Sequence, residues 1–249
     1  LTVKNGETIV VRALWAPKTY TITFNKNCQN DTCTLDGDKN ATIANKTLEY
    51  DAHAFFTPTQ EYARSGYAFA GWSLDKNATT GWGSNTELTG ADIINDTNKN
   101  DSEIVLYATW QPKTYMVNLL PNHNSGTQTT VYEKYATGWC VNRQCSDTIT
   151  SIPVPKRTGY TFTGYYTASQ GGEIKFAPTQ DENGDKIIVL NANNATLVTD
   201  NYLDTPVDLY AQWIANKYTV TLNGNNGTVT PANITVTYDS ESNIDGFSA

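Results

Sequence analysis

The four cysteines are the residues of this chain whose type and spacing most directly predict covalent chemistry. They form two pairs with the same gap, Cys28 with Cys33 and Cys140 with Cys145. Four cysteines allow three pairings, and the equal spacing favours two local disulfides, each closing a small loop worth about 2 kcal/mol. The alternative is one metal site built from both pairs, but the spacing differs from that of zinc knuckles. The sequence therefore predicts two disulfides and, with them, an oxidising extracellular compartment.

Other residue types used in catalysis are sparse and isolated. The two histidines, His53 and His123, lie in different parts of the chain, and no partner motif surrounds either one. The sequence contains no glycine-rich phosphate loop, zinc-binding helix motif or nucleophile elbow. The stretch Asp181-Glu182-Asn183-Gly184-Asp185 has oxygen ligands at alternating positions but lacks the distal glutamate of a calcium loop. It is typical of a polar turn, so we expect no enzyme, no cofactor and no metal site.

Aromatic side chains are the better lead to a binding function, because flat rings stack on sugars and anchor protein interfaces. Five of them lie in or near loops that differ between the two halves of the chain: Trp72, Trp82, Trp139, Tyr165 and Tyr166. Trp72 and Tyr165 occupy equivalent positions of a shared motif, which favours core packing for both. Trp82 and Trp139 have no counterpart, so they are candidate ligand contacts, with core packing as the alternative.

The candidate residues lie between three copies of one phrase, at 13–20, 106–115 and 209–218. In each copy an alternating apolar run ends in a tryptophan, a short hinge follows, and a tyrosine opens a second alternating run. The tryptophans are Trp15, Trp110 and Trp213. Their separations are 110 − 15 = 95 and 213 − 110 = 103 residues, which is the size of a small domain rather than of a solenoid repeat.

The phrase divides the chain into two complete units and two fragments. We expect repeat units at 18–113 and 114–216, the C-terminal strand region of a preceding repeat at 1–17, and the start of a following, truncated repeat at 217–249. Apolar residues two apart on both sides of each tryptophan predict strands with one buried face. No long amphipathic helix is visible, and single helical turns are expected only at 91–94 and 195–198. The units are therefore predicted to be mainly antiparallel β.

Each complete unit also contains an arginine, a Gly-Tyr pair and an alternating aromatic run, at 64–72 and 157–166. The glycine before the tyrosine predicts a turn or a positive φ. The second glycine lies in mid-strand and predicts a close backbone approach or a bulge. The aromatic residues after the first glycine share one face and are candidate core residues: Tyr67, Phe69, Tyr160 and Phe162.

The order of these elements resembles the Listeria-Bacteroides repeat, also called the internalin B-repeat family. The residues that carry the resemblance are the opening strand from Tyr115, the motif at 155–167, Gly171-Gly172 and the closing run 209–213, with a looser match at 66–73 and 106–110. The resemblance implies a β-rich α+β fold of tandem β-grasp-like small domains in an elongated array, on bacterial surface or secreted proteins. The family has no shared catalytic residues to transfer. The insertions and the cysteine pairs depart from its usual pattern.

Composition argues against two kinds of partner. The net charge is −8 and the acidic residues are scattered, whereas nucleic-acid binding needs clustered Lys and Arg. No apolar run approaches the roughly 18–20 residues that span a membrane. We therefore predict a non-enzymatic, extracellular repeat segment that acts as a stalk or adhesin module of a microbial surface protein. Its expected partners are a protein or glycan at a cell surface, or copies of itself.

Two other function classes stay open. One is a carbohydrate-binding or host-receptor-binding module that uses the inserted loops. An exposed aromatic cluster would support that class, and burial of Trp82 and Trp139 would oppose it. The other is a subunit of a self-assembling surface fibre or sheath, whose units would pair at strand edges that lack guarding charges.

Overall fold

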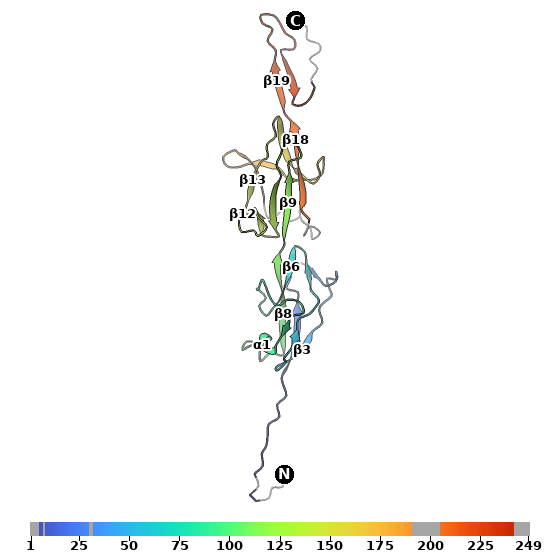
Figure 1. Cartoon of the computed structure of the whole chain (residues 1–249), viewed down its shortest axis with the longest axis vertical. Coiled ribbons are helices and arrows are strands. Elements are labelled where there is room, and N and C mark those ends of the chain that lie inside the picture. Colours follow the sequence, from blue (N-terminus) through green and yellow to red (C-terminus); the bar gives the residue numbers. More distant parts are fainter. Residues whose placement is uncertain (1–4, 7, 30–31, 191–204, 242–249) are drawn as a thin grey trace. The chain divides into compact units, whose positions relative to one another are not determined.

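The computed structural model describes residues 5–6, 8–29, 32–190 and 205–241. The chain forms two units, Leu1–Gln111 and Pro112–Ala249, and each has its own hydrophobic core (Figure 1). Strands dominate both units, and the helix among the described residues is a single turn, α1 (Gly90–Ile93). The predictions of a mainly β fold and of a helical turn near 91–94 are confirmed. The turn expected at 195–198 lies outside the described residues, and the β-grasp assignment stays a prediction.

Both units contain the same four-stranded arrangement, which we call the common sheet. In the first unit its strands, in spatial order, are β6 (Tyr67–Ser73), β8 (Glu103–Pro112), β1 (Thr19–Asn25) and β3 (Lys46–Glu49). In the second unit they are β14 (Tyr160–Tyr166), β18 (Val207–Ala215), β9 (Thr114–Leu120) and β10 (Thr129–Lys134). The strand that opens each unit is therefore the neighbour of the strand that closes it, and the two run parallel.

Alternation of side chains explains why these segments form strands with one buried face. In β1, Tyr20, Ile22 and Phe24 are buried, while the threonines between them are exposed or half-buried. The opening strand β9 repeats the pattern with Tyr115, Val117 and Leu119. Burial of one face across the whole sheet fixes the register, because a shift of one residue would expose every buried side chain.

Further strands extend the common sheet on one side in the first unit and on both sides in the second. The first unit adds, next to β6, the strands β5 (Ala63–Arg64) and β2 (Cys33–Thr34). The second unit adds, beyond β10, the strands β11 (Gly138–Cys140) and β12 (Thr148–Ile149), and, next to β14, the strand β15 (Ile174–Phe176). Separate small sheets are formed by β4 (Phe55–Phe56) with β7 (Glu87–Leu88), and by β13 (Ser151–Pro153), β17 (Lys186–Val189) and β16 (Pro178–Gln180).

The two fragments at the ends of the described chain differ from the complete units. Residues 8–18 contain no strand, and Trp15 is 90% exposed, so this fragment does not form the expected strand within the described residues. The reason is pairing: β8 and β18 each lie between two strands of their own unit, and 17 residues hold neither neighbour. Its assignment to a preceding repeat stays a prediction. Residues 217–237 form an antiparallel hairpin of β19 (Lys217–Thr221) and β20 (Asn233–Thr237), paired as β9 is with β10.

The predicted core residues of the glycine motif are placed only partly as expected. Trp72 and Tyr165 are both buried, and Phe24, Tyr62 and Phe69 surround Trp72 with ring centroids 5.1–5.9 Å away. Of the four candidate core aromatics after the first glycine, Phe162 is buried and the other three are half-buried: Tyr67, Phe69 and Tyr160.

The glycines of the same motif also adopt the predicted conformations. The glycine before each tyrosine, Gly66 and Gly159, has φ of 76°. In mid-strand, Gly71 has φ of 117°, and a Cβ there would lie 2.6 Å from the backbone of Gly81. At the equivalent Gly164, β14 shifts its register against β18. Both predicted features of the second glycine, close approach and a bulge, are therefore confirmed, one in each unit.

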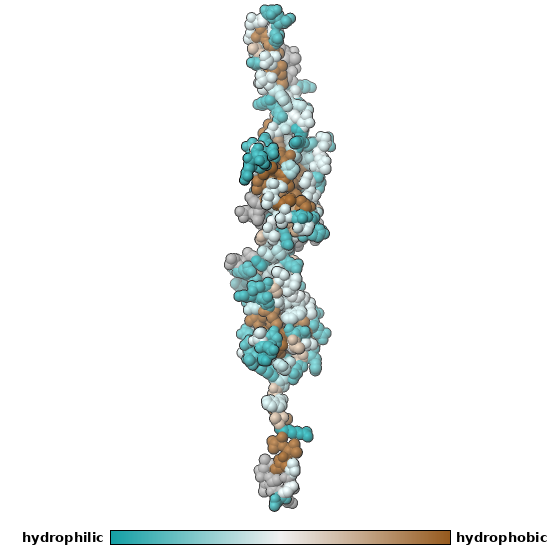
Figure 2. Space-filling view, turned by 90° about the vertical axis from the view of Figure 1, so that its left-hand side faces the viewer, coloured by the Kyte–Doolittle hydropathy of each residue, from teal (hydrophilic) through white to brown (hydrophobic). Residues whose placement is uncertain are grey.

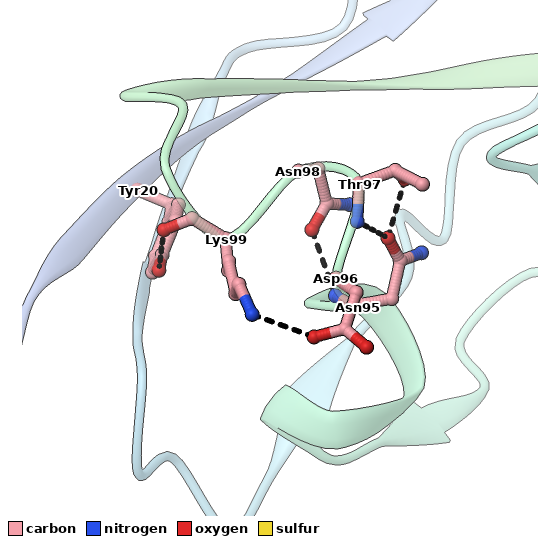
Figure 3. Close-up of polar contacts among 6 residues, drawn as sticks. All are labelled: Tyr20, Asn95, Asp96, Thr97, Asn98 and Lys99. Carbon is pink, nitrogen blue, oxygen red and sulfur yellow. Dashed lines mark hydrogen bonds and ion pairs between the residues drawn. The ribbon is translucent and has the colours of Figure 1, made fainter.

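The loop between α1 and β8 is fixed to the opening tyrosine of the first unit (Figure 3). The Tyr20 hydroxyl donates to the carbonyl of Lys99 at 2.9 Å, and Lys99 pairs with Asp96 at 2.7 Å. Within the loop, the amides of Asn95 and Thr97 donate to side-chain oxygens of Asn98 and Asn95. These bonds hold the residues just before β8 against the start of β1, where the parallel pairing begins.

Candidate functional site

Both predicted disulfides are present. Cys28 is bonded to Cys33 and Cys140 to Cys145, with Cα atoms 6.0 and 5.0 Å apart. Cys33 lies in β2 and Cys140 in β11, which are additions to opposite sides of the common sheet. The two disulfides therefore secure unit-specific additions and are not equivalent features of the repeat.

The two candidate ligand-contact tryptophans lie in different environments. Trp139 is 1% exposed, and its ring packs edge-on against Phe176 at 5.4 Å, which opposes direct contact with a ligand. Trp82 is half-buried, and its backbone exchanges two hydrogen bonds with that of Trp72 at 2.7 and 2.8 Å. Ligand contact stays a prediction for Trp82. The structure brings neither tryptophan into an exposed aromatic cluster within the described residues.

The polar candidates take part in local structure. Asp181 Oδ1 accepts hydrogen bonds from the amides of Asn183 and Asp185, so this carboxylate shapes the turn between β16 and β17. His123 packs its ring against Trp213 at 5.4 Å, and His53 lies in an exposed turn of the other unit. Among the described residues, no three His, Cys, Asp or Glu side chains converge as metal ligands would.

A groove of about 910 Å³ in the second unit lies between residues 151–158 and the β16–β17 hairpin. Its walls carry both charge signs, with Lys156, Arg157 and Lys186 together with Asp181 and Asp185. Apolar side chains, among them Ile152 and Phe162, also line it. The small sheet that borders the groove has three strands, β13, β17 and β16, whereas the small sheet of the first unit has two, β4 and β7.

A polar network recurs at the same end of both common sheets. Trp110 Nε1 donates to the carbonyl of Lys26 at 3.0 Å, and Trp213 Nε1 donates to that of Pro121 at 2.9 Å. The side-chain amide of Asn27 donates to the carbonyls of Ala108 and Lys76. In the second unit, Asn122 donates to Ala211 and Ser169 in the same way.

This network ties the loop after the opening strand to the closing strand in each unit. Asn27 and Asn122 both have φ near 50–57°, a conformation that asparagine tolerates better than most residues. The two asparagines lie seven positions after Tyr20 and Tyr115, as 27 − 20 = 122 − 115 = 7. This equal spacing is the sequence signal that would have identified the two asparagines. The tryptophan of the repeated phrase therefore has a structural role, since it links the closing strand to the loop after the opening strand.

A second recurrent feature is the connection between one repeat and the next segment. The amide of the residue after the second strand donates to the carbonyl of a hinge residue in all three copies: Tyr50 to Lys18, Tyr135 to Lys113 and Tyr238 to Asn216, at 2.8–2.9 Å. These bonds fix the start of each opening strand against its antiparallel partner.

Around Tyr238 the structure shows what this connection does. The Tyr238 ring lies directly on Gly159, where a Cβ would approach ring atoms to 2.3 Å, and it packs edge-on against Tyr160 at 5.6 Å. The Tyr160 hydroxyl donates to Asp239 at 3.0 Å, which raises the pKa of Tyr160. The Arg157 guanidinium also stacks on Tyr160, 3.6 Å from its ring centre. The Gly-Tyr motif of the second repeat thus binds the Tyr-Asp pair of the segment that follows it.

Glu133 is a buried charge that sequence reasoning missed. It lies on β10 opposite Tyr115, is 2% exposed, and its Oε2 has no hydrogen-bond partner. Burial raises its pKa from 4.5 to about 7. Leu48 holds the equivalent position opposite Tyr20 in the first unit, so comparison of the two repeats would have identified Glu133 as a polar residue at a core position.

We predict that stability of the second unit falls as pH rises from 5 to 8. The folded state binds the Glu133 proton more tightly than the unfolded chain, so this contribution is complete below pH 4.5 and lost above about 7. In Glu133→Gln, the fall in the free energy of unfolding between pH 5 and pH 8 should be smaller by roughly 2 kcal/mol. Urea unfolding at several pH values measures it, with the exposed Glu182→Gln as control. An unchanged pH dependence in Glu133→Gln would contradict the assignment.

We predict that Gly159→Ala releases Tyr238 from the Gly-Tyr motif. Gly184 is the matched control, because its φ of 83° is close to the 76° of Gly159 but no atom lies near its added Cβ. Both substitutions carry the backbone cost of about 1 kcal/mol, and only Gly159→Ala also meets the ring. Hydrogen exchange of the Tyr238 amide should accelerate in Gly159→Ala and not in Gly184→Ala. Equal rates would show that the ring contact contributes nothing.

Comparison with known proteins agrees with the repeated architecture. The sequence profile of the Listeria-Bacteroides repeat domain matches residues 20–109 and 122–198. A protein of Evansella cellulosilytica named "Putative membrane protein" is 25% identical over 96% of this chain. Another from the same organism, named "Putative Gly-rich membrane protein", is 22% identical over 91%. The chain spans 28% and 20% of the lengths of these two proteins.

No solved structure matches the chain significantly. In the described part of the chain, no helix combines the length and the hydrophobicity needed to cross a membrane. The two matched segments fall one in each unit and together cover most of the sequence. The chain therefore belongs to the Listeria-Bacteroides repeat domain family.

Proposed function

We propose that this chain is a load-bearing, non-catalytic repeat segment of an extracellular bacterial surface protein, acting as a stalk or adhesin module. The observation that carries the proposal is the parallel pairing of the opening and closing strands in each repeat. The chain enters a repeat at the start of the opening strand and leaves at the end of the closing strand. Tension along the polypeptide therefore pulls these two neighbouring strands in opposite directions along their length.

Such loading is a shear, in which the hydrogen bonds between the two strands resist together. In the first unit the pairing runs from Thr21 with Glu103 to Asn25 with Tyr107. Both ends of this ladder are reinforced by side chains, through Tyr20 to Lys99 at one end and Trp110 to Lys26 at the other. Family membership and the disulfides support an extracellular surface location, because disulfides persist in oxidising compartments.

A binding module is the second candidate function, and the groove at 151–158 favours it. Its mixed charges and apolar side chains suit a peptide or glycan better than a nucleic acid. The fibre alternative has less support, since the edge strand β3 carries Lys46 and Glu49 and the edge strand β15 carries Lys175. Charged residues at sheet edges oppose edge-to-edge pairing.

We predict a high unfolding force for the first repeat when it is pulled between residues 18 and 111. The matched control pulls the same repeat between residues 18 and 102, which lie at the same end of the parallel ladder and so open its bonds one after another. Single-molecule force measurements should give a severalfold higher force for the first geometry. Equal forces in the two geometries would overturn the load-bearing role.

We predict that antibodies raised against this chain label intact cells that produce it. Mild protease treatment of those cells should remove the label, because an extracellular segment is accessible from outside. The control is an antibody against a cytoplasmic protein of the same cells, which should label only permeabilised ones. Labelling of this chain only after permeabilisation would contradict the surface location.

A further inference from the structure

We propose that Asn40 and Asn77 of the first unit are acceptor sites for an N-linked glycan, and that Asp38 and Asp75 select them for the enzyme that attaches it. The proposal assigns a covalent modification and so goes beyond the load-bearing role, although it rests on the proposed extracellular location. It is carried by one pentapeptide, Asp-Lys-Asn-Ala-Thr, which occurs at 38–42 and again at 75–79.

The pentapeptide contains the acceptor motif of N-glycosylation, an asparagine followed two positions later by threonine or serine. Nine asparagines of the chain stand in this motif: Asn30, Asn40, Asn45, Asn77, Asn95, Asn100, Asn194, Asn226 and Asn233. Only Asn40 and Asn77 also have an acidic residue two positions earlier. A carboxylate at this position gives a transferase a charged group to bind with an arginine or a lysine, and so distinguishes these two asparagines from the others.

The two copies of the pentapeptide do not arise from the similarity between the two repeats. Both copies lie in the first unit, one between β2 and β3 and the other between β6 and β7. They therefore occupy two different places in the fold of a single unit. The second unit has no Asn-x-Ser or Asn-x-Thr triplet between residues 112 and 190.

Both copies nevertheless adopt the same local structure. Asp38 Oδ1 accepts a hydrogen bond from the backbone amide of Asn40 at 2.8 Å, and Asp75 Oδ1 accepts one from that of Asn77 at 2.9 Å. In both copies the aspartate, lysine, asparagine and threonine are exposed, and the alanine is half-buried. Each turn uses one oxygen of its carboxylate, and within the described residues the other oxygen has no hydrogen-bond partner.

The backbone of the two turns is anchored to consecutive residues of the loop after β1. Lys26 Nζ donates to the carbonyl of Lys39 at 2.6 Å, and Asn27 Nδ2 donates to the carbonyl of Lys76 at 2.8 Å. Because these bonds bind main-chain oxygens, they hold each turn in place without using the side chains of the pentapeptide.

Formation of a turn explains the aspartate of the pentapeptide but not its asparagine and threonine. In the described part of the chain, the side-chain amides of Asn40 and Asn77 and the hydroxyls of Thr42 and Thr79 make no hydrogen bond. The fold therefore gives no reason for a threonine two positions after each asparagine, whereas the acceptor motif does. Hydrophilic residues are prominent on the surface of the first unit in Figure 2, so a glycan can be attached there without disturbing the core.

The modification is a group transfer from an oligosaccharide that is linked through a diphosphate to a membrane lipid. The side-chain nitrogen of the asparagine forms a bond to the anomeric carbon of the first sugar, and the bond from that carbon to the diphosphate breaks. The lipid diphosphate leaves with the electron pair of that bond, and a carboxylate of the transferase accepts the amide proton. The aspartate and the threonine of this chain bind the transferase and so position the asparagine for the transfer.

The test is peptide mass spectrometry of the protein purified from cells that produce it naturally, with fragmentation that keeps a glycan on its side chain. We expect a glycan on Asn40 and on Asn77. We expect none on Asn45, Asn95 and Asn100, which are exposed in the same unit but lack the aspartate. Absence of a glycan from both Asn40 and Asn77 would overturn the proposal, and equal modification of all five asparagines would overturn selection by the aspartates.

Substitution of each aspartate separates its role in selection from its role in the turn. Asp38→Asn keeps a side-chain oxygen for the turn and removes only the charge, so the glycan occupancy of Asn40 should fall severalfold while that of Asn77 stays the same. Asp75→Asn should have the reverse effect, so each turn is the matched control for the other. Unchanged occupancy in both variants would contradict the role given to the aspartates.

Surface labelling of the same cells distinguishes failure of the glycan sites from failure of the proposed location. Antibody label on intact cells together with unmodified Asn40 and Asn77 would overturn the glycan sites and leave the extracellular location in place. Label that appears only after permeabilisation would contradict the location itself, and with it the premise of the glycan sites.

Discussion

The pairing of the opening strand with the closing strand is the constraint on which each repeat depends. In the first unit it joins Ile22 to Ile104, and in the second Val117 to Val207. These contacts span most of a repeat in sequence, so the whole intervening chain must be folded back before they form. The side-chain bonds at the ends of the ladder lie where the pairing begins and ends, which explains why a tyrosine and a tryptophan bound the first repeat.

The same constraint leaves some parts of the chain free to differ. Additions occur outside the common sheet, on the β6 side in one unit and mainly on the β10 side in the other. Each carries a disulfide that secures it locally. The groove of the second unit is built from such additions as well. Differences in binding between repeats would therefore arise at the borders of a sheet that itself changes little.

Polar groups in the two cores show where the repeats are less than ideally packed. Trp72 Nε1 and Glu133 Oε2 are both buried without a hydrogen-bond partner. Leu48 and Val236 take the place of Glu133 in the other copies, opposite Tyr20 and Tyr218. An isolated buried carboxyl is tolerated when it is protonated and is costly when it is charged. The second repeat consequently depends on pH in a way that the first does not at this position.

Much of the repeat was determined by the sequence alone. Alternation around Trp110 and Trp213 predicted strands with one buried face, the equal cysteine spacing predicted two local disulfides, and the mid-strand glycines predicted close approach and a bulge. These inferences succeeded because each depends on residues a few positions apart, where periodicity and backbone preference act directly.

Only the tertiary structure decided which segments far apart in sequence meet. The alternating pattern of residues 9–15 is the same as that of β8, yet Trp15 is exposed and Trp110 is buried, because burial depends on neighbours contributed by other strands. Trp139 likewise lacked a counterpart in sequence but fills the core of its unit against Phe176. The sequence determined which face of each strand is apolar, and the pairing of distant strands determined whether that face is covered.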